Sequence, residues 1–416
     1  ASYQYFRQKY PHAVITILDE QVIGDVPSDA EIRCGDGVFA GSAEYDMVIR
    51  TPALSPRHIT TNGRIWSATN EFFAECPAPI IGVTGTKGKG TTSSLIASVL
   101  RAAGKTVHLV GNIGTPALEI LPNIQPDDIV IYELSSFQLW DLEKSPHIAV
   151  VLMIEPDHLD VHEDFEEYVA AKAHITAHQT VEDTAIYHPT DTHAHGIARA
   201  SAGKKQRYGV SEDGGVFVRE NTFFVQENAI CGVDTLRIAG VHNYENACAA
   251  ISAVKAIAPE VTNEQVAEGL AAFHGLPHRL KFVRELNEVK YYDDSIATTP
   301  GSAIAAIRAF SEPKVIILGG SDKGADYTEL IKLCQETETT VIAIGQTGKR
   351  IMQLCSSLGV PCERATSMAD AVSIAQCSLE QEGGVVILSP ASASFDMFKS
   401  YADRGEQFIE VVKTLQ

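Results

Sequence analysis

The chain has 416 residues, of which 45% are hydrophobic and 21% charged, and its formal net charge is −20 at pH 7. This length predicts two to three domains, and the composition is typical of a soluble globular protein. The negative charge argues against a nucleic-acid partner, because binding phosphates needs clustered Lys and Arg. No apolar run reaches the ~18 residues of a membrane span and no basic-then-apolar leader is seen, so we expect a cytoplasmic protein without a membrane span.

The eight cysteines are scattered along the chain without a C-x-x-C pair. We therefore expect reduced, buried thiols rather than disulfides or a zinc site. The sequence gives no indication of an oligomeric state.

The first domain is predicted to cover residues 1–73 and to be a Rossmann-like α/β unit. Residues 1–10 are typical of the end of a helix, and residues 13–18 and 47–50 are predicted strands. A strand and a glycine turn would normally come before this helix, so we expect this domain to be incomplete. Residues 76–79, Cys-Pro-Ala-Pro, are a predicted linker.

The central domain, predicted over residues 74–275, opens on a pattern of strand, glycine-rich loop and helix. The apolar run 80–83 leads to glycines at 85, 88 and 90, and a helical pattern follows Thr91. Backbone N–H groups in such a loop, the helix N-terminus and Lys89 are suited to bind nucleotide phosphates. The loop departs from the strict Walker pattern, because Val83 replaces its first glycine and Gly90 follows the lysine.

Further strands are predicted at 107–110, 129–132 and 149–154, as in a doubly wound parallel sheet. Ligands bind at the carboxyl ends of such strands, so we expect the loops that follow them to converge near the phosphate loop. Residues 165–176 and 242–257 are predicted helices, residues 205–240 hairpins and residues 275–279 a linker. A third α/β domain is predicted over 276–416, with strands at 315–318, 341–344 and 385–388.

Two residues at the predicted strand ends are candidates for chemistry from their own positions. Glu133 ends a strand expected beside the phosphate-loop strand, where a carboxylate commonly holds Mg²⁺; the alternative is a solvated acid at a strand end. His158, between Asp157 and Asp160, is a candidate metal or substrate ligand. Lys172, Asn246 and Arg279 have no distinguishing feature when each is considered alone.

Together these motifs resemble those of the Mur ligases, from about residue 75 to the C-terminus. The matching segments are Gly85–Lys89, Gly111–Gly114, Glu133–Gln138, Asp157–Asp160, Tyr168–Lys172, His242–Ala247, Leu276–Arg279 and Asp294–Ser295. Residues 389–405 are similar to the members that add D-glutamate to UDP-N-acetylmuramoyl-L-alanine. The Asp-Asn-Pro-Arg signature of the members that add diaminopimelate or lysine is absent.

The resemblance implies three tandem α/β domains with a P-loop-type parallel sheet in the centre and a C-terminal Rossmann-like domain. It also implies an ATP-dependent ligase of peptidoglycan precursor synthesis, with ATP and Mg²⁺ as cofactors and UDP-muramoyl-L-alanine and glutamate as small-molecule substrates. ATP would phosphorylate the acceptor carboxylate, and the glutamate amine would attack the acyl phosphate. Such a reaction needs cations around crowded anions and accurate positioning of two substrates.

The resemblance further implies roles for individual residues. The residues implied to bind ATP are Gly85, Thr86, Lys87, Gly88, Lys89, Gly90, Thr91, Asn246, Arg279 and Asp294. Those implied for the metal are Thr91, Glu133, His158 and Lys172, the last as a carbamylated lysine; with Lys89, the last three form the implied catalytic set. Those implied to bind the UDP-muramoyl substrate are Asn112, Ser135 and Gln138, and those for glutamate are Thr298, Lys323, Ser394 and Tyr401.

Three features depart from the family pattern. The first is the missing N-terminal strand and turn, which in the family would help to hold the uracil of the UDP substrate. Gly90 stands where a hydroxyl residue usually helps to bind Mg²⁺, which leaves Thr91 as the nearest hydroxyl, and Ile296 stands where a lysine is usual. Two alternatives to D-glutamate addition therefore stay open. One is a family member that uses L-glutamate or another acceptor, and the other is a weakly active paralogue that binds nucleotide or UDP-sugar.

Overall fold

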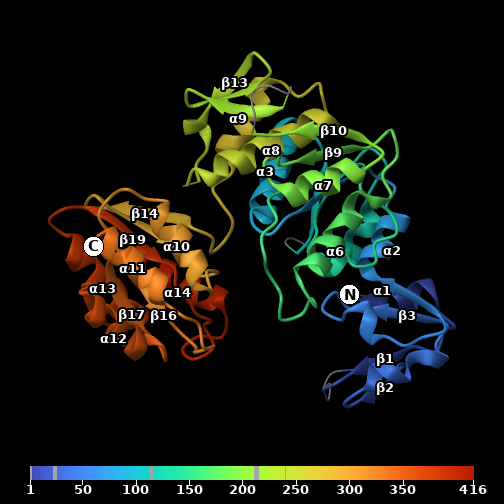
Figure 1. Ribbon diagram of the computed structural model, residues 1–416, viewed down its shortest axis with the longest axis horizontal. Coiled ribbons are helices and arrows are strands. Elements are labelled where there is room, and N and C mark those ends of the chain that lie inside the picture. Colours follow the sequence, from blue (N-terminus) through green and yellow to red (C-terminus); the bar gives the residue numbers. More distant parts are fainter. Residues whose placement is uncertain (1, 22–25, 113–115, 210–214, 239) are drawn as a thin grey trace. The chain divides into compact units, whose positions relative to one another are not determined.

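The computed structural model describes residues 2–21, 26–112, 116–209, 215–238 and 240–416 (Figure 1). It forms two compact units, the first made of residues 1–235 and 245–270 and the second of residues 236–244 and 271–416. The division into three domains at residues 73 and 275 stays a prediction. None of the helices in the described ranges combines the length and the apolar character needed to cross a membrane.

The first unit is built on a six-stranded parallel sheet with the strand order β10-β9-β8-β5-β7-β6. Its strands are β5 (Ile80–Thr84), β6 (Val107–Gly111), β7 (Ile129–Glu133), β8 (Ile148–Val151), β9 (Thr184–Tyr187) and β10 (Lys204–Arg207). The predicted parallel sheet is confirmed, and β7 does pair with β5. The predicted strand 149–154 stops earlier, at Val151, because its partner β5 ends at Thr84 and the chain there turns into the phosphate loop.

The helices of this part of the chain precede, connect or follow the strands of the sheet. They are α1 (Ser2–Lys9), α2 (Ala68–Glu75), α3 (Lys89–Ala102), α4 (Ala117–Ile120), α5 (Ser136–Leu139), α6 (Phe165–Ala177), α7 (Thr192–Ala200), α8 (His242–Ile257) and α9 (Asn263–Ala272). Helix α2 packs on the sheet through Phe72 and Phe73, whose ring centroids lie 5.4 and 5.5 Å from that of Tyr132. The N-terminal helices and the central sheet therefore share one apolar core.

Before the central sheet, the chain forms two small parallel pairs. Strand β1 (Thr16–Asp19) pairs with β2 (Glu31–Cys34), and β3 (Met47–Arg50) pairs with β4 (Arg64–Ser67). The helix predicted at the start and the strand at 47–50 are confirmed. The strand predicted at 13–18 begins only at Thr16, because residues after α1 first close a turn in which Ala13 N–H donates to Tyr10.

The hairpins predicted at 205–240 are confirmed in part. An antiparallel sheet is formed by β11 (Val216–Arg219), β12 (Thr222–Val225) and β13 (Asn228–Gly232). Residues 205–207, however, lie in β10 and extend the parallel sheet by pairing with β9, so their assignment to a hairpin was wrong. Short 3-10 helices lie at Val38–Glu44, Pro56–His58, Leu121–Asn123 and Val233–Thr235.

The second unit contains another six-stranded sheet, of order β14-β15-β19-β16-β17-β18, which is coloured orange to red in Figure 1. Its strands are β14 (Lys281–Leu286), β15 (Val289–Asp293), β16 (Lys314–Gly319), β17 (Thr340–Ile344), β18 (Cys362–Arg364) and β19 (Gly384–Leu388), and only the β14–β15 pair is antiparallel. Its helices are α10 (Pro300–Arg308), α11 (Thr328–Glu336), α12 (Gly348–Leu358), α13 (Met368–Leu379) and α14 (Tyr401–Thr414).

Alternating residues of its central strands supply two separate cores. In β16, Ile316 and Leu318 pack with α10, α11 and α12, whereas Val315 and Ile317 pack with α13 and α14. A strand buried on both faces needs apolar residues at every position, which explains the continuous apolar runs in the sequence. The predicted α/β unit with parallel strands is confirmed here.

Candidate functional site

The predicted phosphate loop joins the end of β5 to the start of α3. Gly85 has φ +148° and Gly88 has φ +82°, backbone conformations that side chains other than glycine rarely adopt. A Cβ atom would lie 2.6 Å from Cβ of Leu152 at Gly85, and 2.4 Å from Oδ1 of Asn246 at Gly88. The loop thus needs glycine at both positions for its conformation and for close packing.

Two lysines converge on the backbone of this loop. Lys89 Nζ donates to the carbonyl oxygens of Gly85 at 3.1 Å and Thr86 at 2.9 Å. Lys172, on α6 and 1% exposed, donates to the same Gly85 oxygen at 2.9 Å and lies 3.4 Å from Thr84 Oγ1. Burial, reinforced by the charge of Lys89, lowers the pKa of Lys172 well below its usual value.

Thr86 fastens the loop to the segment after β8. Its hydroxyl oxygen accepts a hydrogen bond from Glu155 N–H at 2.9 Å, and it lies 3.0 Å from both the Glu155 carbonyl oxygen and the Tyr168 hydroxyl. Lys87, by contrast, is exposed and its Nζ lies 3.1 Å from Glu155 Oε2. Of these two predicted ATP contacts, Lys87 alone has an exposed side chain.

Asn246 lies beside the loop, as its predicted role requires. It sits on α8, and its Oδ1 atom accepts a hydrogen bond from Thr92 Oγ1 at 3.3 Å. Because Gly88 approaches the same oxygen, Asn246 contacts both the loop and the first turn of α3.

Glu133, predicted to bind the metal, is buried at the end of β7, with Val83 of the phosphate-loop strand directly opposite. Thr91 is buried in the first turn of α3. No group of three or more His, Cys, Asp and Glu residues in the described ranges could hold a metal ion alone. Glu133 and Thr91 offer a carboxylate and a hydroxyl oxygen, donors that fit Mg²⁺. In nucleotide sites this ion is usually held by one or two carboxylates together with substrate phosphates and waters.

His158 occupies a left-handed conformation, with φ +55°, in the segment that follows β8. Its half-exposed ring lies 4.9 Å from that of Phe137, and its Nε2 atom is 3.7 Å from Asp157 Oδ2. The predicted convergence of this segment with the one after β7 is therefore confirmed for His158 and Phe137, whereas a metal at His158 stays a prediction.

Ser135 and Gln138, predicted to contact the UDP-muramoyl substrate, form a capping box at the start of α5. The Ser135 N–H donates to Gln138 Oε1 at 2.9 Å, and the Gln138 N–H donates to Ser135 Oγ at 3.3 Å. Asn112 is exposed and its N–H donates to the Glu133 carbonyl at 3.2 Å. Ile113 and Gly114 of the predicted motif lie outside the described residues.

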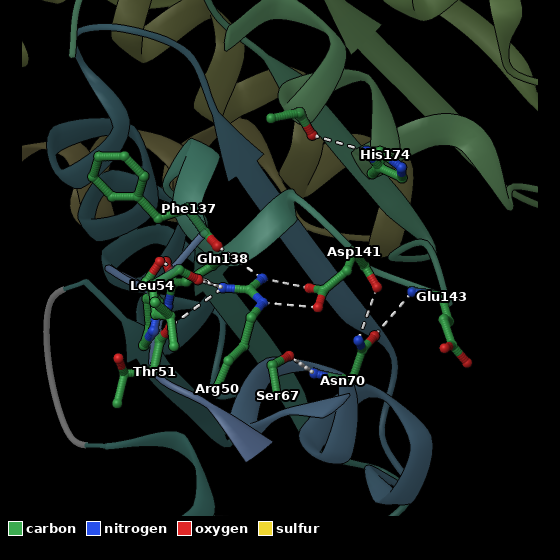
Figure 2. Close-up of polar contacts among 12 residues, drawn as sticks. Arg50, Thr51, Leu54, Ser67, Asn70, Phe137, Gln138, Asp141, Glu143 and His174 are labelled. Carbon is green, nitrogen blue, oxygen red and sulfur yellow. Dashed lines mark hydrogen bonds and ion pairs between the residues drawn. The ribbon is translucent and has the colours of Figure 1, made fainter. Parts of the chain in front are cut away.

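Two residues that contact this segment were missed from the sequence. His162 is buried, and its Nε2 atom lies 2.9 Å from Ser136 Oγ. Burial lowers the pKa of His162. Arg50, at the end of β3, pairs with Asp141 (Figure 2). His162 follows His158 by four residues, and this spacing was a signal for His162 in the sequence. No local pattern pointed to Arg50.

Asp294 and Arg279, the remaining predicted ATP contacts, lie in the second unit. Asp294 follows β15, and its two carboxylate oxygens accept hydrogen bonds from Leu280 N–H at 3.0 Å and Ser389 Oγ at 2.7 Å. Burial raises the pKa of Asp294 to about 7, an effect that these hydrogen bonds and the charge of Arg279 partly offset. The predicted nucleotide residues are thus divided between the two units.

The segments that carry the predicted glutamate contacts Lys323 and Ser394 lie side by side in the second unit. Ser321 and Ala393 form an antiparallel bridge, in which Ser321 N–H donates to the Ala393 carbonyl at 2.8 Å. Lys323 is exposed and Ser394 is buried.

Tyr401 and Thr298 are the other two predicted glutamate contacts. Tyr401, half-exposed, begins α14 and its carbonyl accepts a hydrogen bond from Ser295 Oγ at 2.8 Å. Thr298 is exposed. The buried guanidinium of Arg404 donates to Ser295 Oγ at 2.9 Å and to the carbonyl oxygens of Ser295 and Ser392 at 2.7 and 3.0 Å, and so fixes these segments together.

Family models and curated relatives agree on the family of this chain. Residues 83–254 match the model of the Mur ligase middle domain, and residues 278–392 match the model of the Mur ligase, glutamate ligase domain. UDP-N-acetylmuramoylalanine–D-glutamate ligase of Clostridium kluyveri is 34% identical over 93% of this chain and 87% of the relative. The protein of the same name from Acetivibrio thermocellus is 37% identical, with the same two coverages.

Solved structures are similar in fold at much lower sequence identity. MurF of Acinetobacter baumannii has a TM-score of 0.63 at 17% identity, covering 98% of this chain and 88% of that one. UDP-N-acetylmuramate-alanine ligase MurC of Thermotoga maritima has a TM-score of 0.62 at 18% identity, covering 92% and 89%. With the family models and the curated relatives, these matches establish that the chain belongs to the Mur ligase family and is a ligase with its multi-domain α/β fold.

Proposed function

We propose that this protein is an ATP-dependent ligase that joins D-glutamate to UDP-N-acetylmuramoyl-L-alanine in peptidoglycan precursor synthesis. The observation that carries the proposal is the glycine-rich loop at residues 85–90, with Lys89 on it and the buried Glu133 at the end of the adjacent strand. The substrate assignment rests on the names of the relatives, which share 31–37% of their residues with this chain.

In this proposal the phosphates of ATP lie against the loop and the first turn of α3. Backbone N–H groups and the helix N-terminus favour negative charge there, and Lys89 neutralises the phosphoryl group as it moves to the acceptor carboxylate. In the first unit, Asn246 would contact the nucleotide from α8. Arg279 and Asp294 stay ATP contacts that the family resemblance implies. The Lys89 ammonium now donates to two loop carbonyls, and it would exchange these acceptors for phosphate oxygens.

Glu133, the Thr91 hydroxyl and His158 are the residues that would hold Mg²⁺. When bound, the ion would neutralise charge on phosphate oxygens. Glu133 is positioned for this role because β7 pairs with the phosphate-loop strand over its last residues. Thr91 takes the place of the hydroxyl that Gly90 lacks.

We also propose that Lys172 is carbamylated. Its amine is buried and its pKa is lowered, so the neutral form that can attack CO₂ is favoured. In this reaction the amine nitrogen forms a bond with the carbon of CO₂ and loses a proton, and the side chain becomes an anion. A carboxylate at this point could help to organise cations beside the loop, which the ammonium group cannot do.

The two substrates would be held by residues in different units. Asn112, Ser135 and Gln138 would bind the UDP-muramoyl substrate in the first unit, and Thr298, Lys323, Ser394 and Tyr401 would bind glutamate in the second. Lys323 supplies the cation for a glutamate carboxylate, since Ile296 carries none. We infer a cytoplasmic location from the composition of the chain and from these soluble substrates.

Release of phosphate tests the proposal directly. The protein is incubated with ATP, Mg²⁺ and UDP-N-acetylmuramoyl-L-alanine, and phosphate is measured with D-glutamate, with L-glutamate and with neither. Release that depends on D-glutamate is the expected result. Release with L-glutamate alone would support the alternative that Ile296 suggests, and absence of release with either amino acid would refute the proposed ligase.

A further inference from the structure

Arg50 is an arginine whose side chain is fully buried at the end of β3. Its guanidinium donates two hydrogen bonds to Asp141, from Nε to Oδ2 at 2.8 Å and from Nη2 to Oδ1. Nη2 also donates to the Phe137 carbonyl at 3.0 Å. Figure 2 shows the guanidinium pointing toward the segment that carries Phe137, Gln138 and Asp141.

The third guanidinium nitrogen of Arg50, Nη1, faces the loop that follows β3. Nη1 lies within hydrogen-bond distance of three carbonyl oxygens of the loop after β3, at 3.3 to 3.4 Å: those of Thr51, Pro52 and Leu54. All five N–H groups of the guanidinium therefore have acceptors among the described residues. A side chain engaged in this way has no donor left for a ligand, so any role in the reaction must be exerted through the segments that it holds.

Asn70 also binds this segment, through hydrogen bonds to Asp141 and Glu143. Its Nδ2 atom donates to the Asp141 carbonyl at 2.8 Å, and its Oδ1 atom accepts from Glu143 N–H at 2.9 Å. Asn70 itself is fixed because its N–H donates to Ser67 Oγ, the N-cap of α2, at 3.0 Å. Backbone groups at both ends of residues 137–143 are thus held by residues from before β5.

The segment that Arg50 binds, through Phe137 and Asp141, carries two of the predicted contacts to the UDP-muramoyl substrate, Ser135 and Gln138. Phe137 lies between Ser136 and Gln138 in α5, a helix of only four residues that cannot hold its own position. The side chains of Ser135 and Gln138 each accept a hydrogen bond from the other residue's backbone N–H group. A shift of the Phe137 carbonyl would therefore move both residues. The described contacts of Arg50 fall on residues 51–54 and 137–141, and not on the phosphate loop.

We infer that Arg50 is a positioning residue for the UDP-muramoyl substrate, because it fixes residues 135–141 against the loop at 51–54. This inference rests on the proposed function. Asp141 is the matching partner: its carboxylate balances the buried charge and orients the planar fork. Lysine would keep the charge, but as a compact ammonium it could not serve Asp141, Phe137 and the 51–54 loop at the same time.

The test compares Arg50→Lys and Asp141→Asn with Arg64→Lys. Arg64 is a matched control because its Nη2 pairs with Glu143 Oε2 at 2.7 Å, joining β4 to the same segment, while both side chains are half-exposed. We expect Arg50→Lys and Asp141→Asn each to raise the KM for UDP-N-acetylmuramoyl-L-alanine by about tenfold or more, with the KM for ATP changed less than about twofold. Arg64→Lys should change neither constant.

Hydrogen exchange of the free protein provides a readout that needs no activity. Arg50→Lys should speed amide exchange in residues 136–143 and leave residues 85–100 unchanged. Equal rises in both KM values, or unchanged exchange in residues 136–143, would overturn the inference. A wild-type protein without activity would refute the proposed function alone, because the exchange result would still decide whether Arg50 holds this segment.

Discussion

Lys89 and Lys172 donate hydrogen bonds to one acceptor, the carbonyl oxygen of Gly85, at 3.1 and 2.9 Å. Two ammonium groups so close to one carbonyl repel each other, and the buried one loses its proton more readily. The pKa of Lys172 is accordingly lowered, first by burial and then by Lys89. The arrangement shifts Lys172 toward its neutral form beside the phosphate loop.

The first prediction concerns this amine. If Lys172 acts as a carbamate, Lys172→Ala should lose most of the ligase activity, because the anion beside the loop is removed. Added short carboxylic acids should restore part of the activity by occupying the space that the side chain leaves. Phosphate release is measured with and without acetate, and mass spectrometry of the gently handled wild type should show the added CO₂.

A suitable control is Lys105→Ala, which removes a partly exposed lysine paired with Glu260 in the same unit. It should keep full activity and show no response to acetate. Full activity of Lys172→Ala would refute the carbamate, and a loss that no carboxylic acid relieves would leave the lysine with a structural role only.

The second prediction concerns Lys89. Lys89→Ala should lower kcat by at least about 100-fold, equivalent to roughly 2.7 kcal/mol, because the transferred phosphoryl group loses its cation. The fold should persist, because Thr86 also fastens the loop through its hydrogen bonds with the backbone of Glu155. Turnover and far-UV circular dichroism are compared with Lys105→Ala. Unchanged turnover in Lys89→Ala would mean that this loop is not the nucleotide site.

Much of the fold could be predicted from the sequence because the signals are local. The apolar runs at 80–83, 129–132 and 315–318 predicted buried parallel strands, and the structure confirms strands there. The pairing of β7 with β5, which brings Glu133 to the phosphate loop, followed from the general rules of doubly wound sheets. Residues 204–207 have no apolar run, so their membership of the parallel sheet depended on pairing with β9.

The connections that hold the site could not be predicted in the same way. Arg50 and Asp141 are 91 residues apart, and no local spacing relates them. The contact between Thr92 and Asn246 spans 154 residues. The family resemblance pointed to Asn246 because it belongs to a motif, but it gave no reason to select Arg50. Long-range polar contacts of this kind become visible only when the chain is folded.

The third prediction concerns pH and Asp294. Burial raises the pKa of Asp294 from 3.8 to about 7. The folded chain therefore holds a proton at this group between about pH 4 and 7 that the unfolded chain has lost, so this group's contribution to stability falls as the pH rises through this window. At pH 8 the raised pKa of Asp294 lowers the free energy of unfolding by at most roughly 4 kcal/mol, because the pKa values of the folded and unfolded chain differ by about three.

Asp294→Asn should remove this cost, since asparagine carries no charge at any pH. The gain in Tm over the wild type should be larger at pH 8 than at pH 4.5, as measured by calorimetry. Glu382→Gln, which changes an exposed carboxylate in the same unit, serves as the control and should show no such dependence. An equal Tm difference at the two pH values would contradict the raised pKa.

The last prediction concerns the proposed glutamate site in the second unit. Lys323 follows the end of β16, and Ser394 follows the bridge between Ser321 and Ala393, so both could reach one carboxylate. An unpaired carboxylate in a buried site costs several kcal/mol, and Ile296 supplies no charge. Lys323→Ala should therefore raise the KM for glutamate by ~10- to 100-fold, equivalent to roughly 1.4 to 2.7 kcal/mol, with a much smaller effect on ATP.

Two further variants define what this result means. Ile296→Lys should tighten the binding of glutamate, because it adds a cation to the proposed site, and Lys332→Ala, which removes an exposed lysine of α11 paired with Glu329, should change no constant. KM values for glutamate and ATP are measured for all three variants under the same conditions. Equal losses for ATP and glutamate in Lys323→Ala would mean that this lysine serves the phosphates, and the assignment of the glutamate site would have to be abandoned.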